Sequence, residues 1–151
     1  MEYAAAVWDP HLKKDIHKLE NIQRRAARFV RHDYSYESSA TKMLRELGWS
    51  NLEDRRRDLR LALLFKICNG HLGITPEDIG LEPGDGRTRS THSKKLRAKG
   101  GITSNYTNSF AVRTVAPWNK LPKVVVEQGS PEAFKAELMA HWASASTIRA
   151  P

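Results

Sequence analysis

The sequence predicts a mainly α-helical fold: a small bundle of three N-terminal helices and one C-terminal helix, with a long basic loop between them. Apolar residues recur with helical spacing in residues 10–31, 39–47, 52–69 and 131–142. Serine, glycine and proline stand where these stretches begin or end, as they do at helix termini. Residues 106–115 are instead rich in β-branched and aromatic side chains, so they are expected to form a short strand or hairpin arm.

These stretches divide the chain into three expected segments. Residues 1–70 form a helical block, and residues 71–105 form a basic loop or linker that is rich in glycine, serine and threonine. Residues 106–151 form a C-terminal module with the short strand, a Trp-Asn turn and the final helix. A chain of 151 residues has the length of one domain or of a piece of a larger protein.

Residues 10–31 form the helix on which the rest of the chain is expected to be organised. Asp9 is expected to cap it, and Pro10 suits its first position because proline lacks an N–H there. One face is apolar and is expected to lie on a core; it holds Leu12, Ile16, Leu19, Ile22, Ala26, Ala27, Phe29 and Val30. The opposite face is basic and has no carboxylate; it holds Lys13, Lys14, His17, Lys18, Arg24, Arg25, Arg28 and Arg31.

This basic face has three interpretations. It could contact the phosphates of a nucleic acid, because so many bases on one face exceed what solubility requires. It could be the solvated face of an ordinary core helix. It could also lie on a membrane surface or bind a partner as a calmodulin-type helix does.

The next two helices have clear sequence boundaries. Tyr34 and Tyr36 are expected to pack over the end of the first helix. Ser38 or Ser39 begins a short helix that Gly48 ends. Residues 50–53, Ser-Asn-Leu-Glu, match a capping box at the start of the third helix. From Leu61 onward that third helix is apolar on nearly every side, so it is expected to be the central core helix.

The second half of the chain carries weaker signals. Residues 75–78, Thr-Pro-Glu-Asp, form a second capping signature that Gly80 limits to a turn or two. Ser130 and Pro131 are expected to cap the last helix, which places Phe134, Leu138 and Trp142 on one face. The four tryptophans are expected to pack in the core rather than to stack on bases: Trp8, Trp49, Trp118 and Trp142.

The net charge of +8 predicts an anionic partner. Apart from the first helix, the excess is concentrated between residues 87 and 99, where six bases and no acid stand. This segment is either a solvated loop or an arm that contacts nucleic acid. Its candidate contacts are Arg87, Arg89, Lys94, Lys95, Arg97 and Lys99.

No catalytic constellation is recognisable. The residues contain no nucleophile elbow and no pair of metal-binding histidines, and Cys68 is the only cysteine, so a disulfide framework is excluded. No metal, cofactor or small-molecule substrate is expected for this chain. No apolar run is long enough for a membrane span and no signal peptide is evident, so we expect an intracellular protein, nuclear or cytoplasmic, with no membrane partner.

Several motifs taken together resemble a known family. They are Trp8-Asp-Pro10, then Leu19-Glu-Asn-Ile-Gln23-Arg24-Arg25-Ala26, then Leu47-Gly48-Trp49, then Arg113-Thr114 followed by Trp118-Asn119 and Leu121-Pro122. Their order and spacing resemble the C-terminal region of reverse transcriptases of non-LTR (LINE-type, jockey-like) retrotransposons. The resemblance extends from residue 2 to about residue 138.

The resemblance implies that this chain is a C-terminal fragment of an RNA-directed DNA polymerase. The endonuclease and the Mg²⁺-dependent catalytic palm of such proteins lie upstream and are absent, so the chain alone is not expected to be an enzyme. Residues 1–70 resemble the helical thumb, which implies sequence-independent binding of RNA or of an RNA–DNA hybrid and contact with the missing palm and finger domains. A protein-interaction or scaffold module and a non-functional transposon remnant are the alternatives.

Overall fold

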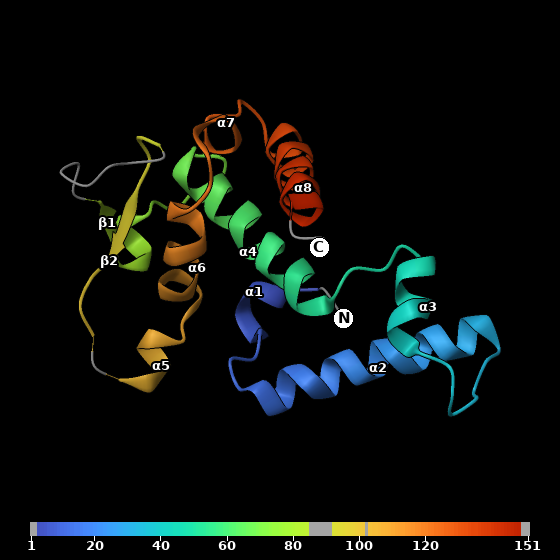
Figure 1. The fold of residues 1–151 in the computed structure, drawn as a ribbon. Coiled ribbons are helices and arrows are strands. Elements are labelled where there is room, and N and C mark those ends of the chain that lie inside the picture. The colour runs from blue at the N-terminus through green and yellow to red at the C-terminus, as the bar shows by residue number, and fades with distance from the viewer. Residues whose placement is uncertain (1–2, 85–91, 102, 149–151) are drawn as a thin grey trace. The chain divides into compact units, whose positions relative to one another are not determined.

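The structure, a computed structural model, describes residues 3–84, 92–101 and 103–148 (Figure 1). It is mainly α-helical with one small antiparallel sheet of two strands, which confirms the predicted fold class. The chain separates into two compact units, Met1–Arg57 and Asp58–Pro151. The boundary lies inside a helix rather than near residue 70, because the two halves of that helix pack in different units. The predicted division into residues 1–70, 71–105 and 106–151 therefore differs from the observed units.

The first unit consists of helices. It contains α1 (Ala5–Trp8), α2 (Lys13–Arg31), α3 (Ala40–Glu46) and the first turns of α4 (Leu52–Cys68). α3 packs across α2, and Ala27, Met43 and Leu44 form the small core between them, with Leu47 and Trp49 against it. The predicted boundaries of α3 are confirmed: the Ser39 hydroxyl accepts from Lys42 N–H, and Gly48 ends the helix with a φ of 67°.

The predicted start of α2 is wrong. The helix begins at Lys13 with Leu12 at its N-cap, so neither Asp9 nor Pro10 caps or begins it. Asp9 is instead engaged with α4, where its Oδ1 accepts from Arg56 Nε at 2.7 Å. Both side chains are almost fully buried, with 4% and 1% exposed. A carboxylate that is paired in the interior cannot also satisfy the first N–H groups of α2.

The predicted apolar face of α2 is mostly not covered. Among the residues of this helix only Gln23 and Ala27 are buried, while Ile22, Phe29 and Val30 are 47%, 66% and 50% exposed. The reason is length: α3 has seven residues and is about 10 Å long, whereas the 19-residue α2 is about 28 Å long. A short helix that crosses a long one buries only the residues at the crossing.

The second unit surrounds the apolar half of α4. It contains η1 (Glu77–Ile79), β1 (Leu81–Pro83), β2 (Leu96–Ala98), α5 (Ser104–Thr107), α6 (Phe110–Asn119), α7 (Lys123–Val126) and α8 (Pro131–Ile148). Phe65 on α4 stacks on Phe134 on α8, with ring centroids 4.4 Å apart. The predicted role of α4 as core helix is confirmed; the core also includes Leu61, Leu64, Leu81, Trp118, Leu121, Val126 and Leu138.

The predicted strand over residues 106–115 is wrong. These residues lie in α5 and α6, where Ala111, Thr114 and Trp118 follow one another at helical spacing and are buried. The β-branched side chains were a weak signal, because burial against a neighbouring element overrides strand propensity. Conversely, part of the predicted loop is β2, which pairs with β1 in the register Leu81↔Ala98 and Pro83↔Leu96.

Two predicted helix starts in this unit are confirmed. Asp78 Oδ2 accepts from Thr75 N–H, Thr75 Oγ1 accepts from Asp78 N–H, and Gly80 ends η1 with a φ of 75°. At α8, Ser130 Oγ accepts from Ala133 N–H at 3.1 Å. Phe134 and Leu138 are buried on one face, as expected.

Candidate nucleic-acid interface

Four basic residues of α2 form an exposed strip, which we call the basic strip: Lys13, Lys14, Arg24 and Arg25. All four are exposed, and none pairs with a carboxylate among the residues that the structure describes. At 100° per residue their positions span an arc of roughly 120°, and Lys13 and Arg24 are about 16 Å apart along the axis. The basic strip is therefore one elongated cationic surface on a single rigid element.

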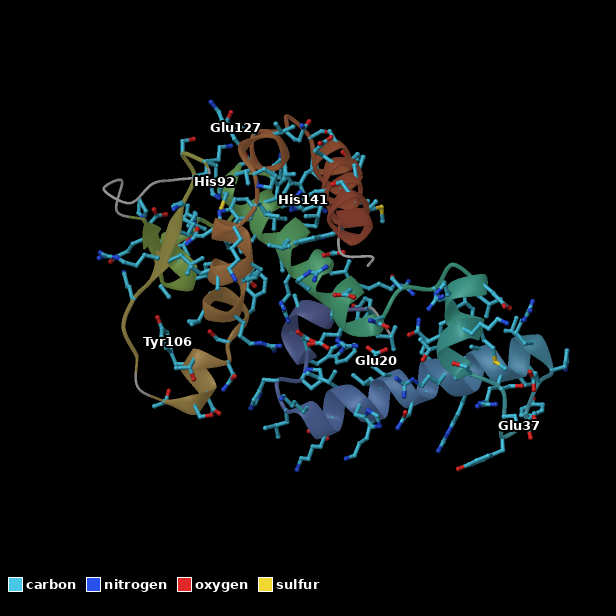
Figure 2. The ribbon with its side chains drawn as sticks, in the orientation of Figure 1. Glu20, Glu37, His92, Tyr106, Glu127 and His141 are labelled. Carbon is cyan, nitrogen blue, oxygen red and sulfur yellow. The ribbon has the colours of Figure 1, made fainter. Side chains whose placement is uncertain are left out.

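One flank of α2, next to the basic strip, is held by the segment that leads into α4. Glu20 accepts from Glu53 N–H at 2.8 Å and from Leu52 N–H at 3.3 Å, so its carboxylate caps α4. Gln23 Nε2 donates to the Ser50 carbonyl at 2.9 Å. Figure 2 shows Glu20 on the side of α2 that faces the start of α4. These contacts fix the rotation of α2 within the first unit and leave the basic strip facing solvent.

Three predicted contacts of α2 have partners within the protein. Lys18 lies 3.1 Å from Asp15 on the same helix, although 74% of the lysine side chain is exposed. Arg31 pairs with Glu46 at 2.6 Å. Arg28 donates to the carbonyls of Ser35 and Ser38 at 2.9 and 2.8 Å, so it holds the loop that follows α2. Lys18 and Arg31 of the basic face are thus paired with carboxylates that lie outside that face, one on α2 itself and one on α3.

The predicted basic loop is largely engaged in the second unit. Lys94 Nζ donates to Asn69 Oδ1 at 2.6 Å. Arg97 and Lys99 lie 2.8 and 3.9 Å from Glu82 across the sheet. Lys95 is half-buried. Arg87 and Arg89 lie outside the described residues. Among the basic residues of this loop that the structure describes, most therefore have partners within the second unit.

The motif residues that carry the family resemblance have structural contacts. Trp118 is fully buried, and its Nε1 donates to the Lys94 carbonyl at 2.8 Å. Asn119 accepts from Leu96 N–H and donates to the Leu96 carbonyl, at 3.0 and 2.8 Å. Thr114 is buried and its hydroxyl donates to the carbonyl of Phe110.

The other tryptophans and Arg113 complete the set of motif residues. Trp8 is 39% exposed and donates to the Tyr3 carbonyl, so its predicted burial in the core is wrong. Trp49 and Trp142 are half-buried, and Trp142 Nε1 donates to Asp58 Oδ1 at 3.0 Å. Arg113 is half-buried and acts on Arg60: burial, with the charge of Arg113, lowers the pKa of Arg60 to about 10.

Sequence reasoning missed the roles of two residues: Glu20, which holds the helix of the basic strip in the first unit, and Asn119, which holds β2 in the second unit. Glu20 stands on the same helix as the bases, yet its partners are 32 and 33 residues further along the chain. Asn119 reaches across 23 residues to Leu96. Neither pairing leaves a local spacing signal, although the motif Trp118-Asn119 itself was visible.

The described residues contain no group of three metal-binding side chains, and no helix among them is long and apolar enough to cross a bilayer. Comparisons with protein-family models, curated proteins and solved structures find no match to this chain. The basic strip is a cationic surface whose four side chains are exposed.

Proposed function

We propose that this chain binds RNA or an RNA–DNA hybrid without sequence preference, through the basic strip of α2. The observation that carries the proposal is the exposure of Lys13, Lys14, Arg24 and Arg25 without carboxylate partners among the described residues. A duplex presents a regular row of phosphates, and cations spaced along a straight helix can each neutralise one. The major groove of an A-form duplex is too deep and narrow for side chains to read base edges, so the contacts proposed here are with phosphates.

We further propose that the chain is the C-terminal part of a non-LTR retrotransposon reverse transcriptase, working in the nucleus or cytoplasm beside its palm and finger domains. The order of the motifs supports this parentage. Support also comes from the kind of contact that Gln23, Trp118 and Asn119 make, since residues that hold backbone segments together are those a shared fold would require. Mg²⁺ would belong to the catalytic palm of the parent polymerase and not to this chain.

Binding at a series of salt concentrations tests the proposed activity. A labelled RNA–DNA hybrid is titrated with the full chain, and the affinity should fall steeply as salt rises, because each neutralised phosphate adds about 0.9 to the log–log slope. Affinity that does not respond to salt, or no binding near micromolar protein at low salt, would refute it. Primer extension with Mg²⁺ and nucleotides should give no product.

A protein-interaction module is the second candidate, and one observation favours it. Ile22, Phe29 and Val30 are exposed on α2, so part of this helix could lie against another protein, such as the rest of a polymerase. Charge reversal at Arg24 and Arg25, two exposed residues of the basic strip, separates the two functions. The proposed function predicts that the variant no longer binds nucleic acid. If nucleic-acid binding is unchanged, the basic face instead serves to contact an acidic protein. A remnant without function would show no ligand response in hydrogen exchange.

A further inference from the structure

Three aromatic side chains at the C-terminal end of α2 are exposed, contrary to the expectation that the tyrosines pack over the helix end. Tyr36 is 101% exposed, Tyr34 is 65% exposed and Phe29 is 66% exposed. Scattered exposed apolar residues are ordinary. Three aromatic rings within eight residues, beside a cationic surface, are a concentrated feature and require an explanation.

The loop that carries the tyrosines is held in one conformation by hydrogen bonds. Ser38 N–H donates to the Ser35 carbonyl at 3.3 Å, which closes a tight turn with Tyr36 and Glu37 at its tip. Asp33 Oδ1 accepts from Ser35 N–H at 3.0 Å, and Ser35 Oγ accepts from Glu37 N–H at 3.3 Å. The loop is thus fixed by its own hydrogen bonds, while its aromatic rings contribute little to holding it.

Arg28 brings this loop back to α2. Its guanidinium donates to the carbonyls of Ser35 and Ser38, and Figure 1 shows the chain between α2 and α3 returning beside the end of α2. On a helix Arg28 lies one turn from Arg24, and Phe29 lies one turn from Arg25. Phe29 and the loop that carries the two tyrosines therefore lie on the C-terminal side of the basic strip.

The negative charge of the loop favours the nucleobases of a nucleic acid over its phosphates as the ligand. Asp33 and Glu37 are acidic; hydrogen bonds from Ser38 and Ser35, with Arg28 and Arg31 nearby, keep the pKa of Asp33 below its ordinary value. A phosphate would be repelled from the tip of such a loop. An unpaired base has no charge, and its face stacks readily on tyrosine or phenylalanine.

We infer that Tyr34, Tyr36 and Phe29 form a stacking surface for unpaired bases of a nucleic acid whose backbone lies on the basic strip. This inference rests on the proposed function and narrows it: the preferred ligand is an RNA–DNA hybrid that continues into a single strand. Tyrosine suits this role because it presents a large face and loses little rotamer freedom on binding. A loop that is already held in place before binding loses less conformational entropy when the ligand binds.

The experiment compares two probes on the full chain. One is a blunt RNA–DNA hybrid, and the other is the same hybrid with a single-stranded RNA overhang that contains 2-aminopurine. The wild type should bind the overhang probe about tenfold more tightly, and stacking should quench the 2-aminopurine fluorescence. Tyr34→Leu combined with Tyr36→Leu should remove both effects and leave binding of the blunt hybrid unchanged.

Two controls make the comparison specific. Tyr34→Phe with Tyr36→Phe keeps the aromatic faces and should behave as the wild type. Tyr3→Leu replaces another tyrosine that is 95% exposed, one that precedes α2 instead of following it, and should also have no effect. Because all three tyrosines are exposed, circular dichroism should show the same helix content in every variant.

The outcomes separate this inference from the proposed function. If the leucine variant discriminates the probes and quenches 2-aminopurine as the wild type does, the stacking surface is refuted while electrostatic binding stands. If the wild type binds neither probe, both proposals fail. If the leucine substitutions instead abolish self-association in sedimentation without changing either affinity, the aromatic side chains form a contact between copies of the chain, and the inference is overturned.

Discussion

The carboxamide of Asn119 satisfies both backbone groups of Leu96: its Oδ1 accepts from the N–H at 3.0 Å and its Nδ2 donates to the carbonyl at 2.8 Å. A side chain thereby takes the place of a neighbouring strand on β2. Trp118, the preceding residue, donates to the Lys94 carbonyl and lies beside Phe134 in the core. The pair Trp118-Asn119 therefore attaches the short sheet to α6.

Replacing Asn119 should destabilise the second unit. Asn119→Ala leaves the Leu96 N–H and carbonyl without these partners, and an unsatisfied buried backbone group costs about 1–3 kcal/mol. We expect a loss of that size in the free energy of unfolding, measured in urea. Asn105→Ala, at an exposed asparagine, is the matched control and should change stability little. Equal effects of the two substitutions would contradict the assigned role of Asn119.

The start of α4 provides a second test, because sequence and structure assign its cap to different residues. The capping box predicts Ser50, whereas the structure places the Glu20 carboxylate on the N–H groups of Leu52 and Glu53. Glu20→Ala should therefore cost about 1 kcal/mol, and Ser50→Ala should cost much less. Urea unfolding of both variants decides between the two caps. A larger loss of stability for Ser50→Ala would show that Ser50, as the capping box predicts, caps α4.

This difference shows what the sequence could and could not predict. The presence of α2, α3, α4 and α8 followed from local periodicity, whereas the start of α2 and the end of α8 differ from the predicted bounds. The cap of α4 and the clamp on Leu96 depend on residues more than 20 positions apart, which no local pattern encodes. The prediction of a strand over residues 106–115 was wrong for the same reason, because a helix is what allows Ala111, Thr114 and Trp118 to be buried together in the core.

The candidate site was foreseen in part. The basic side of α2 was correctly placed as a helix face, and Lys13, Lys14, Arg24 and Arg25 are exposed there. The sequence could not show that Arg28 and Arg31 have partners, because the carbonyls of Ser35 and Ser38 and the carboxylate of Glu46 come from a separate loop and helix. The exposure of Tyr34 and Tyr36 was likewise hidden, since it depends on where Arg28 holds the loop.

Stability should depend on pH through His92. The ring is buried, and its Nε2 lies 3.1 Å from the Trp118 carbonyl, to which the neutral ring donates. Burial lowers the pKa of His92 below 6.5, with Lys95 adding to the effect and the Trp118 carbonyl and Glu127 opposing it. Around pH 6 the unfolded chain therefore binds more protons at this position than the folded chain.

The sign of the effect follows from that difference. The contribution of His92 to stability is complete above pH 6.5 and is lost as the pH falls from 6.5 toward the pKa of the folded state. Urea unfolding at a series of pH values, for the wild type and for His92→Gln, isolates it. The difference in free energy between the two proteins should shrink as the pH falls; a difference that stays constant would show that His92 does not titrate in this range.

The thiol of Cys68 should report on the second unit. Burial raises its pKa from 9.0 to about 11, so the thiolate at neutral pH is about 100-fold scarcer than in an unfolded chain. We expect the thiol to react with a disulfide reagent about 100-fold more slowly in the native protein than in urea. Because Cys68 is the only cysteine, the signal is unambiguous. Equal rates would mean that the core of the second unit does not bury this side chain.

The central claim is that the basic strip of α2 contacts phosphates, and the salt dependence of hybrid binding tests it most directly. One variant replaces the four strip residues, Lys13, Lys14, Arg24 and Arg25, with glutamine. A control variant removes the same charge from exposed positions elsewhere: Lys42, Arg45, Lys120 and Lys135. At about 0.9 per contact, neutralising the basic strip should reduce the log–log slope by about 3 to 4, and the control should leave the slope nearly unchanged. Equal slopes for the two variants would contradict the account.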